Sequence, residues 1–524
     1  MHTDDSQFHL VPHAGQGIWS VARLRAVEQA AVDEGIDESM LVERAAAGAA
    51  RVIEQCYPSA ARIAILCGTG NNGADGYALA CRLRRARHEV CVWAPCGEPR
   101  TQAARHVCAA CAQAGIPIHR GVPRGEEPGF DLIVDALFGI GLSRPVEGNA
   151  RECIAWMNQT AAPTLALDIP SGLHADTGQI MGCAARADHT VTFLGLKRGF
   201  FTADGPDVTG RLALDDLNVS ATVPPQPSAS VLNEKELIKL LPPRRRSAHK
   251  GCFGRCLIVG GGLGMPGAAL LAAHAALRVG AGLVRVATHP QHASAAACSQ
   301  PEALWHGVTD VAELEKVLSR ASCIVVGPGL GLSSWGRSLW DRVVQAKCPL
   351  VVDADALTLL AQQPCRRSDW ILTPHPKEAA GLLGCSVVKI QRDRFAAAEE
   401  LCRRYGGVAV LKGAATVIAS NASSVESAFE KRCDVCLAGN PGMASAGMGD
   451  VLAGILGGLS AQLHPSSAGL NDVARLGVLL HAHAGDLAAV ARGERGLLAR
   501  DVIDRLRGLV NPQRQEKSAA TPRR

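Results

Sequence analysis

The sequence between Arg62 and Tyr77 reads RIAILCGTGNNGADGY, and this stretch decides the fold. Its first six residues form an apolar run typical of a buried β-strand. Four glycines follow, and residues 78–87 then have the composition of a helix. A strand, a glycine-rich turn and a helix in this order are typical of a parallel sheet covered by helices. We therefore expect the stretch to begin an α/β domain.

The same alternation recurs along most of the chain. The apolar runs predict strands at residues 62–67, 89–93, 132–135, 164–168, 189–193, 255–260, 283–287, 323–327, 350–353, 370–373, 408–411 and 416–419. Residues 221–230 interrupt this pattern with three prolines in a short polar run, which favours an extended linker. We therefore expect two doubly wound α/β domains, one on each side of the linker.

Composition narrows the class of protein. The chain has 524 residues, of which 47% are hydrophobic and 20% charged, so it can form roughly two to four domains and is not disordered throughout. The net charge, 54 − 49 = +5, is too diffuse to predict binding of nucleic acid. The best candidate for a membrane span, residues 266–288, is interrupted by His274, Arg278 and Arg285. We expect no nucleic-acid partner and no membrane association.

The cysteines indicate a reducing compartment. Their number, 19, is odd, and they are scattered through predicted helices and strands. The two C-x-x-C pairs, at residues 108–111 and 433–436, lie too far apart in the chain to suggest one zinc site. Residues 1–17 are polar and lack the apolar core of a secretory signal, and like residues 512–524 they predict a loose tail. We therefore expect a cytoplasmic protein with mostly reduced thiols.

Three loops that follow predicted strands carry oxygen-bearing side chains. Their sequences are NNGAD (residues 71–75), DALFGIGLSRP (residues 135–145) and LDIPSGLHAD (residues 167–176). Ligands of doubly wound sheets bind beyond the carboxyl ends of the strands, so we expect Asn72, Asp135 and Ser171 to lie at one edge. Neutral and singly charged oxygens suit a monovalent cation better than zinc.

The first loop also satisfies the G-x-G-x-x-G pattern through Gly68, Gly70 and Gly73. A dinucleotide-binding dehydrogenase would have an acidic residue at the end of the next strand to hold the ribose. The chain has no acid there before Glu98. The pattern therefore argues for a phosphate-binding helix start without arguing for a dehydrogenase.

The three loop motifs together resemble the NAD(P)H-hydrate epimerase family, over about residues 20–218. The resemblance implies that Asn72, Asp135 and Ser171 bind potassium and that Asp168 acts as the acid/base group on the substrate ring. It implies a hydrate-binding surface made of Asn71, Asn72, Gly73, Ala74, Asp75, Gly139, Ile140, Gly141, Leu142, Ser143, Arg144, Pro145 and Asp168. Ala74 departs from the family pattern, which usually has glycine, and its methyl group could crowd the loop.

The C-terminal half contains a stronger motif, NPGMASAGMGDVLAG, at residues 440–454. A glycine turn feeds an apolar helix predicted at residues 451–459, so free backbone N–H groups can gather a phosphoryl group. Asp450 falls in the first turn, where we expect the helix dipole to lower its pKa and keep it ionised as a base. A simple N-capping role is the structural alternative. Upstream, Lys412 in the turn LKGAAT is a candidate phosphate contact.

These two elements in this order resemble the ribokinase-like superfamily. The loops GPGLG (residues 327–331), DADAL (residues 353–357) and TPHPKE (residues 373–378) narrow the resemblance to the ADP-dependent NAD(P)H-hydrate dehydratases, over about residues 231–510. It implies nucleotide binding by Lys412, Gly413, Ala414, Ala415, Thr416 and Gly449. It implies contact with the hydrate by Ala268, Gly329, His375 and Asp450, with Asp450 as catalytic base. His375 could instead be a loop histidine with only structural partners.

The resemblances together imply two three-layer αβα domains. A Rossmann-like epimerase domain would span residues 18–221, a linker residues 222–230, and a ribokinase-like dehydratase domain residues 231–511. The implied enzyme interconverts the R and S hydrates of NADH and NADPH and dehydrates the S form while ADP becomes AMP and phosphate. Its implied ions are potassium at the epimerase site and magnesium on the nucleotide, and we expect a homo-oligomer.

Two other functions are compatible with parts of this pattern. One is a ribokinase-like kinase of a vitamin precursor fused to a sensing domain. The other is an interaction module, in which an epimerase-like domain serves only as a scaffold. Degraded domains of that kind would have lost Asp135, Asp168 or the asparagine pair, and this sequence retains all of them.

Overall fold

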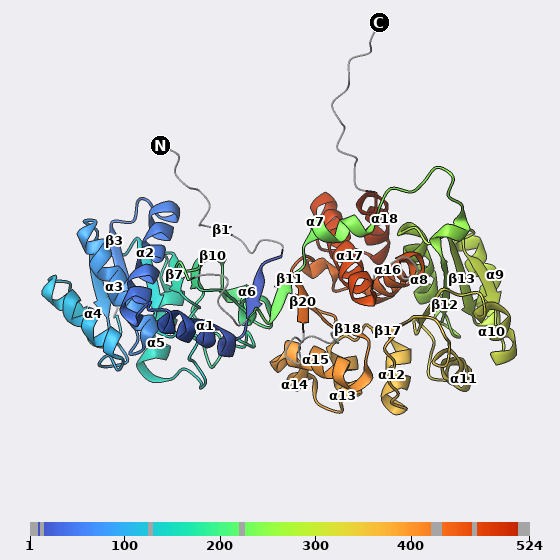
Figure 1. Cartoon of the computed structure of the whole chain (residues 1–524), viewed down its shortest axis with the longest axis horizontal. Helices are drawn as coiled ribbons and strands as arrows, with labels where there is room; N and C mark the ends of the chain where they lie inside the picture. Colours follow the sequence, from blue (N-terminus) through green and yellow to red (C-terminus); the bar gives the residue numbers. More distant parts are fainter. Residues whose placement is uncertain are drawn as a thin grey trace, which may run out of the picture. The chain divides into compact units, whose positions relative to one another are not determined.

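A computed structural model describes residues 9–10, 15–123, 129–219, 226–420, 432–463 and 469–511. The chain forms two compact units, Met1–Val231 and Leu232–Arg524 (Figure 1). Within the predicted linker, residues 222–225 lie outside the described part, and the end of the segment forms a short strand, β11 (Ala229–Val231). This strand pairs with β2 (Gly17–Trp19), which in turn pairs with β9 (Leu196–Lys197).

Both predicted tails lie largely outside the described part of the chain. Residues 512–524 are outside it, and so are residues 1–8 and 11–14. Residues 9–10, predicted as tail, instead form strand β1 (His9–Leu10), which pairs antiparallel with β10. Polar composition alone did not indicate this edge strand.

The N-terminal unit is built on an eight-stranded sheet in the order β1-β10-β8-β7-β6-β3-β4-β5. Apart from β1 its strands are parallel, and their bounds are β3 (Arg62–Cys67), β4 (Glu89–Trp93), β5 (Ile118–His119), β6 (Leu132–Ala136), β7 (Thr164–Leu167), β8 (His189–Phe193) and β10 (Arg211–Asp215).

Helices cover both faces of this sheet because the strands are apolar on both sides. Ile63 and Ile65 of β3 belong to the core shared with α2 (Glu38–Cys56), α3 (Asn71–Arg85) and α4 (Gln102–Gln113). Ala64 and Leu66, which point the opposite way, pack in the core with α5 (Gly148–Gln159). The predicted three-layer αβα architecture is confirmed.

The C-terminal unit repeats the plan with nine strands in the order β14-β13-β12-β15-β16-β17-β18-β19-β20. The strands are parallel up to β18, and the last two pair antiparallel. Their bounds are β12 (Arg255–Val259), β13 (Leu283–Thr288), β14 (Leu304–Gly307), β15 (Cys323–Val326), β16 (Leu350–Val352), β17 (Trp370–Leu372), β18 (Val408–Leu411), β19 (Thr416–Ser420) and β20 (Arg432–Cys436).

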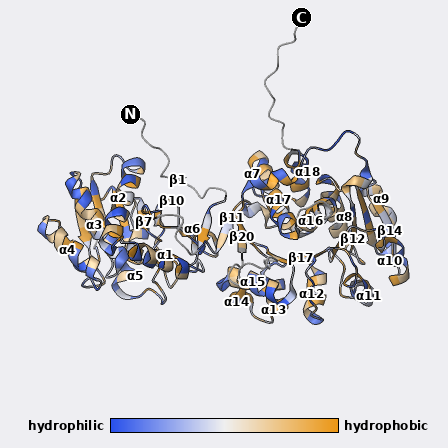
Figure 2. Cartoon of the chain, in the orientation of Figure 1, coloured by the Kyte–Doolittle hydropathy of each residue, from blue (hydrophilic) through white to orange (hydrophobic). Residues whose placement is uncertain are grey.

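Two groups of helices cover this second sheet (Figure 1). One face carries α8 (Pro266–Arg278), α16 (Met448–Leu463), α17 (Leu470–Arg492) and α18 (Ala499–Leu509), whose side chains share one apolar core. The other group is α11 (Ser334–Val343), α12 (Asp355–Gln362), α13 (Pro376–Leu383), α14 (Val387–Arg392) and α15 (Arg394–Tyr405). Most helices mix hydrophilic and hydrophobic residues, as expected for one buried and one exposed face (Figure 2).

One helix among the described residues, α17, is long and apolar enough to cross a membrane by composition. It is a different segment from the best sequence candidate, residues 266–288, which forms a helix and a separate strand. In α17, 61% of the apolar window is buried inside the protein, and the helix packs against α16 and α18. These contacts are those of a core helix.

The glycine-rich segments become helical earlier than predicted. α3 begins at Asn71 and α16 at Met448, so the residues expected in loops occupy the first turns of helices. Apolar periodicity, the sequence feature that predicts a helix, starts only after the glycines. At Gly73 a Cβ would overlap the Gly68 carbonyl oxygen, so glycine is required where α3 packs against the end of β3.

Candidate functional site

A cavity of about 900 Å³ lies beyond the carboxyl ends of β3, β6 and β7 in the N-terminal unit. Helices α1 (Val21–Asp33) and α2 form its other wall. The position agrees with the expectation for a doubly wound sheet. Of the predicted hydrate-binding residues, the cavity is lined by Asn71, Asn72, Asp75, Gly139, Ile140, Gly141, Leu142, Ser143, Arg144 and Asp168.

Three predicted hydrate-binding residues, Gly73, Ala74 and Pro145, are not among the lining residues. Ala74 is fully buried in the core between α3 and the sheet, so its methyl group fills space behind the cavity. The crowding considered from the sequence does not occur in the cavity.

The three predicted potassium ligands have buried oxygen atoms. Asp135 and Ser171 are fully buried, and the Ser171 hydroxyl donates to Asp135 Oδ1 at 2.6 Å while the Ser171 N–H donates to Oδ2 at 2.7 Å. Burial raises the pKa of Asp135 to about 6, although the Ser171 hydrogen bonds oppose the rise. The amide oxygen and nitrogen of Asn72 are buried without a hydrogen-bond partner among the described residues. Such an unpartnered amide is suited to binding a ligand.

Asp168 reaches the cavity from the end of β7. Its backbone has a positive φ of 65°, and its carboxylate Oδ1 accepts a hydrogen bond from Lys197 Nζ at 2.5 Å. Lys197 is only 1% exposed and also donates to the Thr192 hydroxyl at 2.6 Å and the Phe193 carbonyl at 2.9 Å. All three donors of the ammonium group are therefore used, and Asp168 is held in one orientation.

Two further carboxyl groups line the same cavity. Burial raises the pKa of Glu28, on α1, and the negative charge of Asp168 raises it further. Burial and Asp168 likewise raise the pKa of Asp75 well above its usual range. The cavity thus contains an ion-paired carboxylate beside two carboxyl groups whose pKa values are raised, an arrangement able to move protons on and off a bound ring.

In the C-terminal unit, Gly449 and Asp450 lie in the first turn of α16. A Cβ at Gly449 would lie 3.3 Å from Lys412 Nζ and 3.6 Å from Asp353 Oδ2, so the glycine backbone directly approaches both charges. Burial raises the pKa of Asp450 to about 7, with a further contribution from Asp353. The expectation that the helix dipole would lower this pKa is wrong, because burial and neighbouring carboxylates outweigh the dipole.

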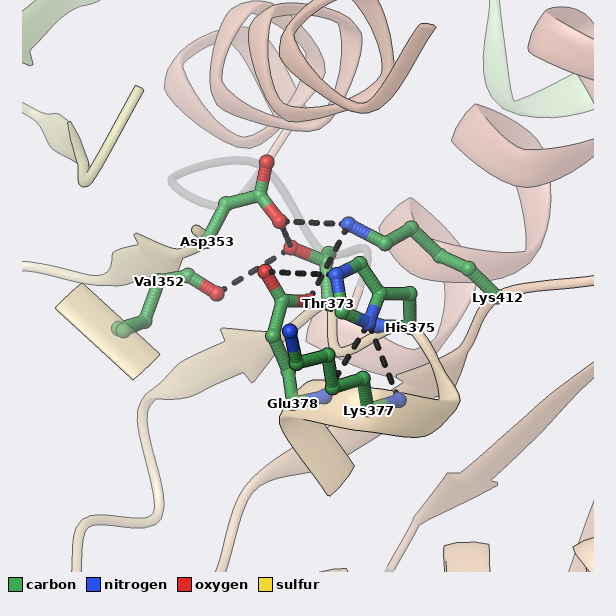
Figure 3. A network of polar contacts seen from close by, with 7 residues as sticks. All are labelled: Val352, Asp353, Thr373, His375, Lys377, Glu378 and Lys412. Carbon is green, nitrogen blue, oxygen red and sulfur yellow. Dashed lines mark hydrogen bonds and ion pairs between the residues drawn. The ribbon is translucent and has the colours of Figure 1, made fainter. Parts of the chain in front are cut away.

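Lys412 is the centre of a polar network (Figure 3). Its Nζ lies 2.7 Å from Asp353 Oδ1 and 3.8 Å from Glu378 Oε2. The Thr373 hydroxyl donates to the same Asp353 oxygen at 2.8 Å and thereby fixes the carboxylate. Burial opposes the charge of Lys412, but Asp353 and Glu378 raise its pKa overall. The ammonium therefore stays charged within reach of Asp450.

Of the predicted hydrate contacts in this unit, His375 has structural hydrogen-bond partners, and Gly329 and Ala268 lie next to each other. His375 Nδ1 accepts from the backbone N–H groups of Lys377 and Glu378, both at 3.1 Å, and so caps α13. This is the structural role that the sequence left open, although the imidazole remains half exposed. Gly329 has a φ of 57°, and a Cβ there would lie 3.1 Å from the Ala268 methyl group. These two residues therefore lie together.

The predicted nucleotide-binding segment, residues 412–416, forms the turn between β18 and β19. The Thr416 hydroxyl donates to the Gly413 carbonyl at 3.0 Å, and the Lys412 N–H donates to the Pro374 carbonyl at 2.9 Å. Ala415 has a φ of 50°, an unusual value for a residue with a side chain. The turn and the start of α16 lie together, since Lys412 from one approaches Gly449 from the other.

Comparison with known proteins gives the same two-part division. Residues 38–199 match the family model described as YjeF-related protein N-terminus, and residues 256–507 match the model described as NAD(P)H-hydrate dehydratase. The bifunctional NAD(P)H-hydrate repair enzyme Nnr of Coxiella burnetii is 43% identical over 495 residues, which cover 94% of this chain and 98% of that protein. The enzyme of the same name from Escherichia coli is 40% identical, with 97% and 96% covered.

The chain belongs to the family of bifunctional NAD(P)H-hydrate repair enzymes. The predicted resemblance and the predicted enzyme class are thereby confirmed. Among solved structures, the ADP/ATP-dependent NAD(P)H-hydrate dehydratase of Bacillus subtilis, co-crystallised with ATP and magnesium, is 29% identical. The match covers 53% of this chain and 96% of that one, with a TM-score of 0.46.

Sequence reasoning missed several charged residues of this repair enzyme. Lys197 and Glu28 lie far from Asp168 in the sequence and carry no motif of their own. Asp353 and Glu378 lie in the loop motifs at residues 353–357 and 373–378, which by themselves indicate no role for either side chain. The position of Asp353 is a signal of a functional role, because this residue directly follows the buried strand β16 and is itself only 1% exposed.

Proposed function

We propose that the C-terminal unit dehydrates the S hydrates of NADH and NADPH while converting ADP to AMP and phosphate. The proposal rests chiefly on Asp450, whose carboxyl lies at the start of α16 beside the Lys412 ammonium and the half-buried backbone of Gly449. A base, a cation and free N–H groups at one point are the parts needed for phosphoryl transfer to a hydroxyl.

The reaction proceeds through proton and phosphoryl transfer. Asp450 accepts the proton of the substrate hydroxyl, and the hydroxyl oxygen attacks the terminal phosphorus of ADP while the bond to the AMP oxygen breaks. Lys412 and the N–H groups at the start of α16 stabilise the charge on the moving phosphoryl group. The phosphorylated oxygen then leaves the ring, driven by the lone pair of the ring nitrogen, and loss of a ring proton restores the dihydronicotinamide.

We infer that the N-terminal unit interconverts the R and S hydrates in its cavity. Asp168, held by Lys197, is the acid/base group that faces the reacting ring. Asn71, Asn72, Asp75 and the segment 139–144 surround the hydrate. This activity feeds the S-specific step, so that both epimers are repaired.

Potassium fits the buried oxygens behind the wall of this cavity. Asn72, which lines the cavity, has a buried, unpartnered amide, and the oxygens of Asp135, in β6, and Ser171, in the loop after β7, are fully buried. When bound, the ion would steady the three loops by coordinating these oxygens. For magnesium, no group of three or more His, Cys, Asp or Glu side chains in the described ranges is arranged to hold a metal. We therefore propose that magnesium arrives on the phosphates of ADP. We further propose a cytoplasmic homo-oligomer.

The proposal is tested by adding ADP to hydrated NADPH and following the return of nicotinamide absorbance. We expect full recovery from a mixture of R and S hydrates with the wild-type protein, together with one AMP per hydrate repaired. Recovery of the S fraction alone would contradict the epimerase assignment. No recovery, with phosphorylation of a hydroxymethylpyrimidine or hydroxyethylthiazole instead, would favour a vitamin-precursor kinase.

A further inference from the structure

Arg394, the first residue of α15, lies beneath the turn of residues 412–416. The residue is only 4% exposed. Its guanidinium donates to the backbone carbonyls of Leu411 at 3.2 Å and Lys412 at 3.3 Å, and to the side chain of Gln391 at 3.0 Å. One side chain from a separate helix thus supports the end of β18 and the beginning of the turn.

The turn lies directly against the guanidinium group. A Cβ at Gly413 would lie 2.8 Å from one terminal nitrogen of Arg394 and 3.0 Å from the other. Gly413 also has a φ of 140°, which disfavours any side chain. The glycine therefore allows the backbone of the turn to rest on the cation.

The positive charge of Arg394 lacks an anionic partner in the described ranges. Its two terminal nitrogens donate to two backbone carbonyl oxygens and one side-chain amide oxygen. Its Nε has no hydrogen-bond partner among the described residues. Burial lowers the pKa of the group to about 10, so the guanidinium remains charged at neutral pH. A buried charge without a counter-ion is costly, and a diphosphate on the opposite side of a thin glycine turn would reduce this cost.

We propose that Arg394 is a positioning residue for the nucleotide: its guanidinium shapes the turn of residues 412–416 and supplies positive charge to the diphosphate of ADP. This role rests on the proposed dehydratase function, since it requires the turn to bind ADP. The residue does not touch the nucleotide, and it acts through Lys412 and Gly413.

The test measures equilibrium binding of ADP and of adenosine to the full-length protein. In Arg394→Met we expect ADP affinity to fall about 10- to 100-fold, the range for losing hydrogen bonds from a charged group. Adenosine affinity should change by less than about 3-fold, because adenosine has no charge for the guanidinium to attract. Arg394→Lys keeps the charge without the fork of donors, so it should recover part of the ADP affinity.

Arg403→Met is the matched control, because Arg403 lies on the same helix with an exposed side chain paired to Glu400. It should bind both ligands like the wild type. Equal losses of ADP and adenosine in Arg394→Met would indicate a purely structural role and overturn the proposal, as would wild-type ADP binding. If Arg394→Met does not fold, the Arg394→Lys variant decides: equal weakening of both ligands overturns the proposal. A wild-type protein that neither binds nor consumes ADP would instead refute the proposed function.

Discussion

Each unit places an aspartate–lysine pair at the edge of its sheet, and the two pairs serve their proposed catalytic groups differently. In the N-terminal unit the lysine holds the aspartate proposed as the acid/base group, with Lys197 Nζ 2.5 Å from Asp168. In the C-terminal unit Lys412 is held by Asp353, at 2.7 Å, and Asp450 lies nearby. The proposed base of the second site, Asp450, is therefore near a cation without being bound to it.

This difference separates two ways of preparing a carboxylate for proton transfer. Asp168 is fixed by a buried donor, and the proton-holding groups are its neighbours Glu28 and Asp75, whose pKa values are raised. In the C-terminal unit the raised pKa belongs to the proposed base itself, since burial and Asp353 raise the pKa of Asp450 to about 7. A carboxyl with a pKa near the working pH can accept a proton and release it again within one cycle.

The largest expected effect comes from replacing the bases one at a time. Asp450→Asn should lower the rate of dehydration about 10²- to 10⁴-fold, because the amide cannot accept the hydroxyl proton. Epimerisation should be unchanged, since Asp450 belongs to the other compact unit. The measurement is the rate of NADPH recovery from purified S hydrate, with the rate of R-to-S conversion recorded separately.

Asp168→Ala should give the opposite result. Epimerisation should fall by a similar factor of about 10² to 10⁴ while dehydration of the S hydrate continues. Wild-type epimerisation in Asp168→Ala would refute the assignment of Asp168. Simultaneous loss of both activities in either variant would show that the two sites are not independent.

The second prediction concerns the ion pair of the N-terminal unit. Lys197→Met should lower the free energy of unfolding of this unit by about 3 kcal/mol, because Asp168 and two oxygen acceptors lose their donor. We choose the low end of the range for broken buried pairs because Asp168 is partly open to the cavity. The change is measured by urea unfolding, with hydrogen exchange of the β7 and β8 amides as the probe of the N-terminal unit.

Arg186→Met supplies the control for Lys197→Met, because Arg186 is an exposed cationic residue of the same unit. It should unfold like the wild type. An unchanged midpoint in Lys197→Met would mean that the pair does not hold Asp168, and the proposed contrast between the two sites would fail.

The third prediction uses the raised pKa of Asp450. The base form is the carboxylate, so kcat/KM for dehydration should decrease as pH falls through about 7, by about tenfold for each pH unit below it. Above this pH the rate should level off. In Asp450→Asn the residual rate should lose this dependence, and a wild-type rate that stays constant down to pH 5 would contradict the assigned environment.

The sequence predicted the strands and their ligand-binding edge because both depend on local features. β3, β4 and β8 have the predicted bounds, since each is a short run of apolar or β-branched residues that begins at a polar residue. The shared position of the loops after β3, β6 and β7 then follows from the rule that parallel strands end at one edge. The helix starts at Asn71 and Met448 were missed because glycines obscure the first turn.

The electrostatics of the sites could not be predicted in the same way. Lys197 reaches Asp168 through tertiary packing, and no spacing in the sequence connects it with the motif LDIPSG. The pKa of Asp450 depends on how much water its neighbours exclude and on the position of Asp353, which follows strand β16, far from Asp450 in the sequence. The sequence predicted the helix and therefore its dipole, but it did not predict the burial or the approach of Asp353, which oppose the effect of the dipole on this pKa.

The smallest expected effect tests whether Ala74 supports the cavity only from behind. Ala74→Gly restores the usual family residue, removes a fully buried methyl group and places a second glycine beside Gly73 in α3. We expect the free energy of unfolding to fall by about 1 to 2 kcal/mol, of which about 1 is the lower helix propensity of glycine. Ala109→Gly, at an exposed position within α4, isolates that propensity. Because Ala74 does not line the cavity, the KM of epimerisation should remain within about 2-fold of the wild-type value. A 2-fold change corresponds to a few tenths of a kcal/mol, or roughly 0.4 kcal/mol. A larger change in KM would indicate that the Ala74 methyl group contacts the substrate. The contrast between the two sites would then rest only on how Asp168 and Asp450 are held.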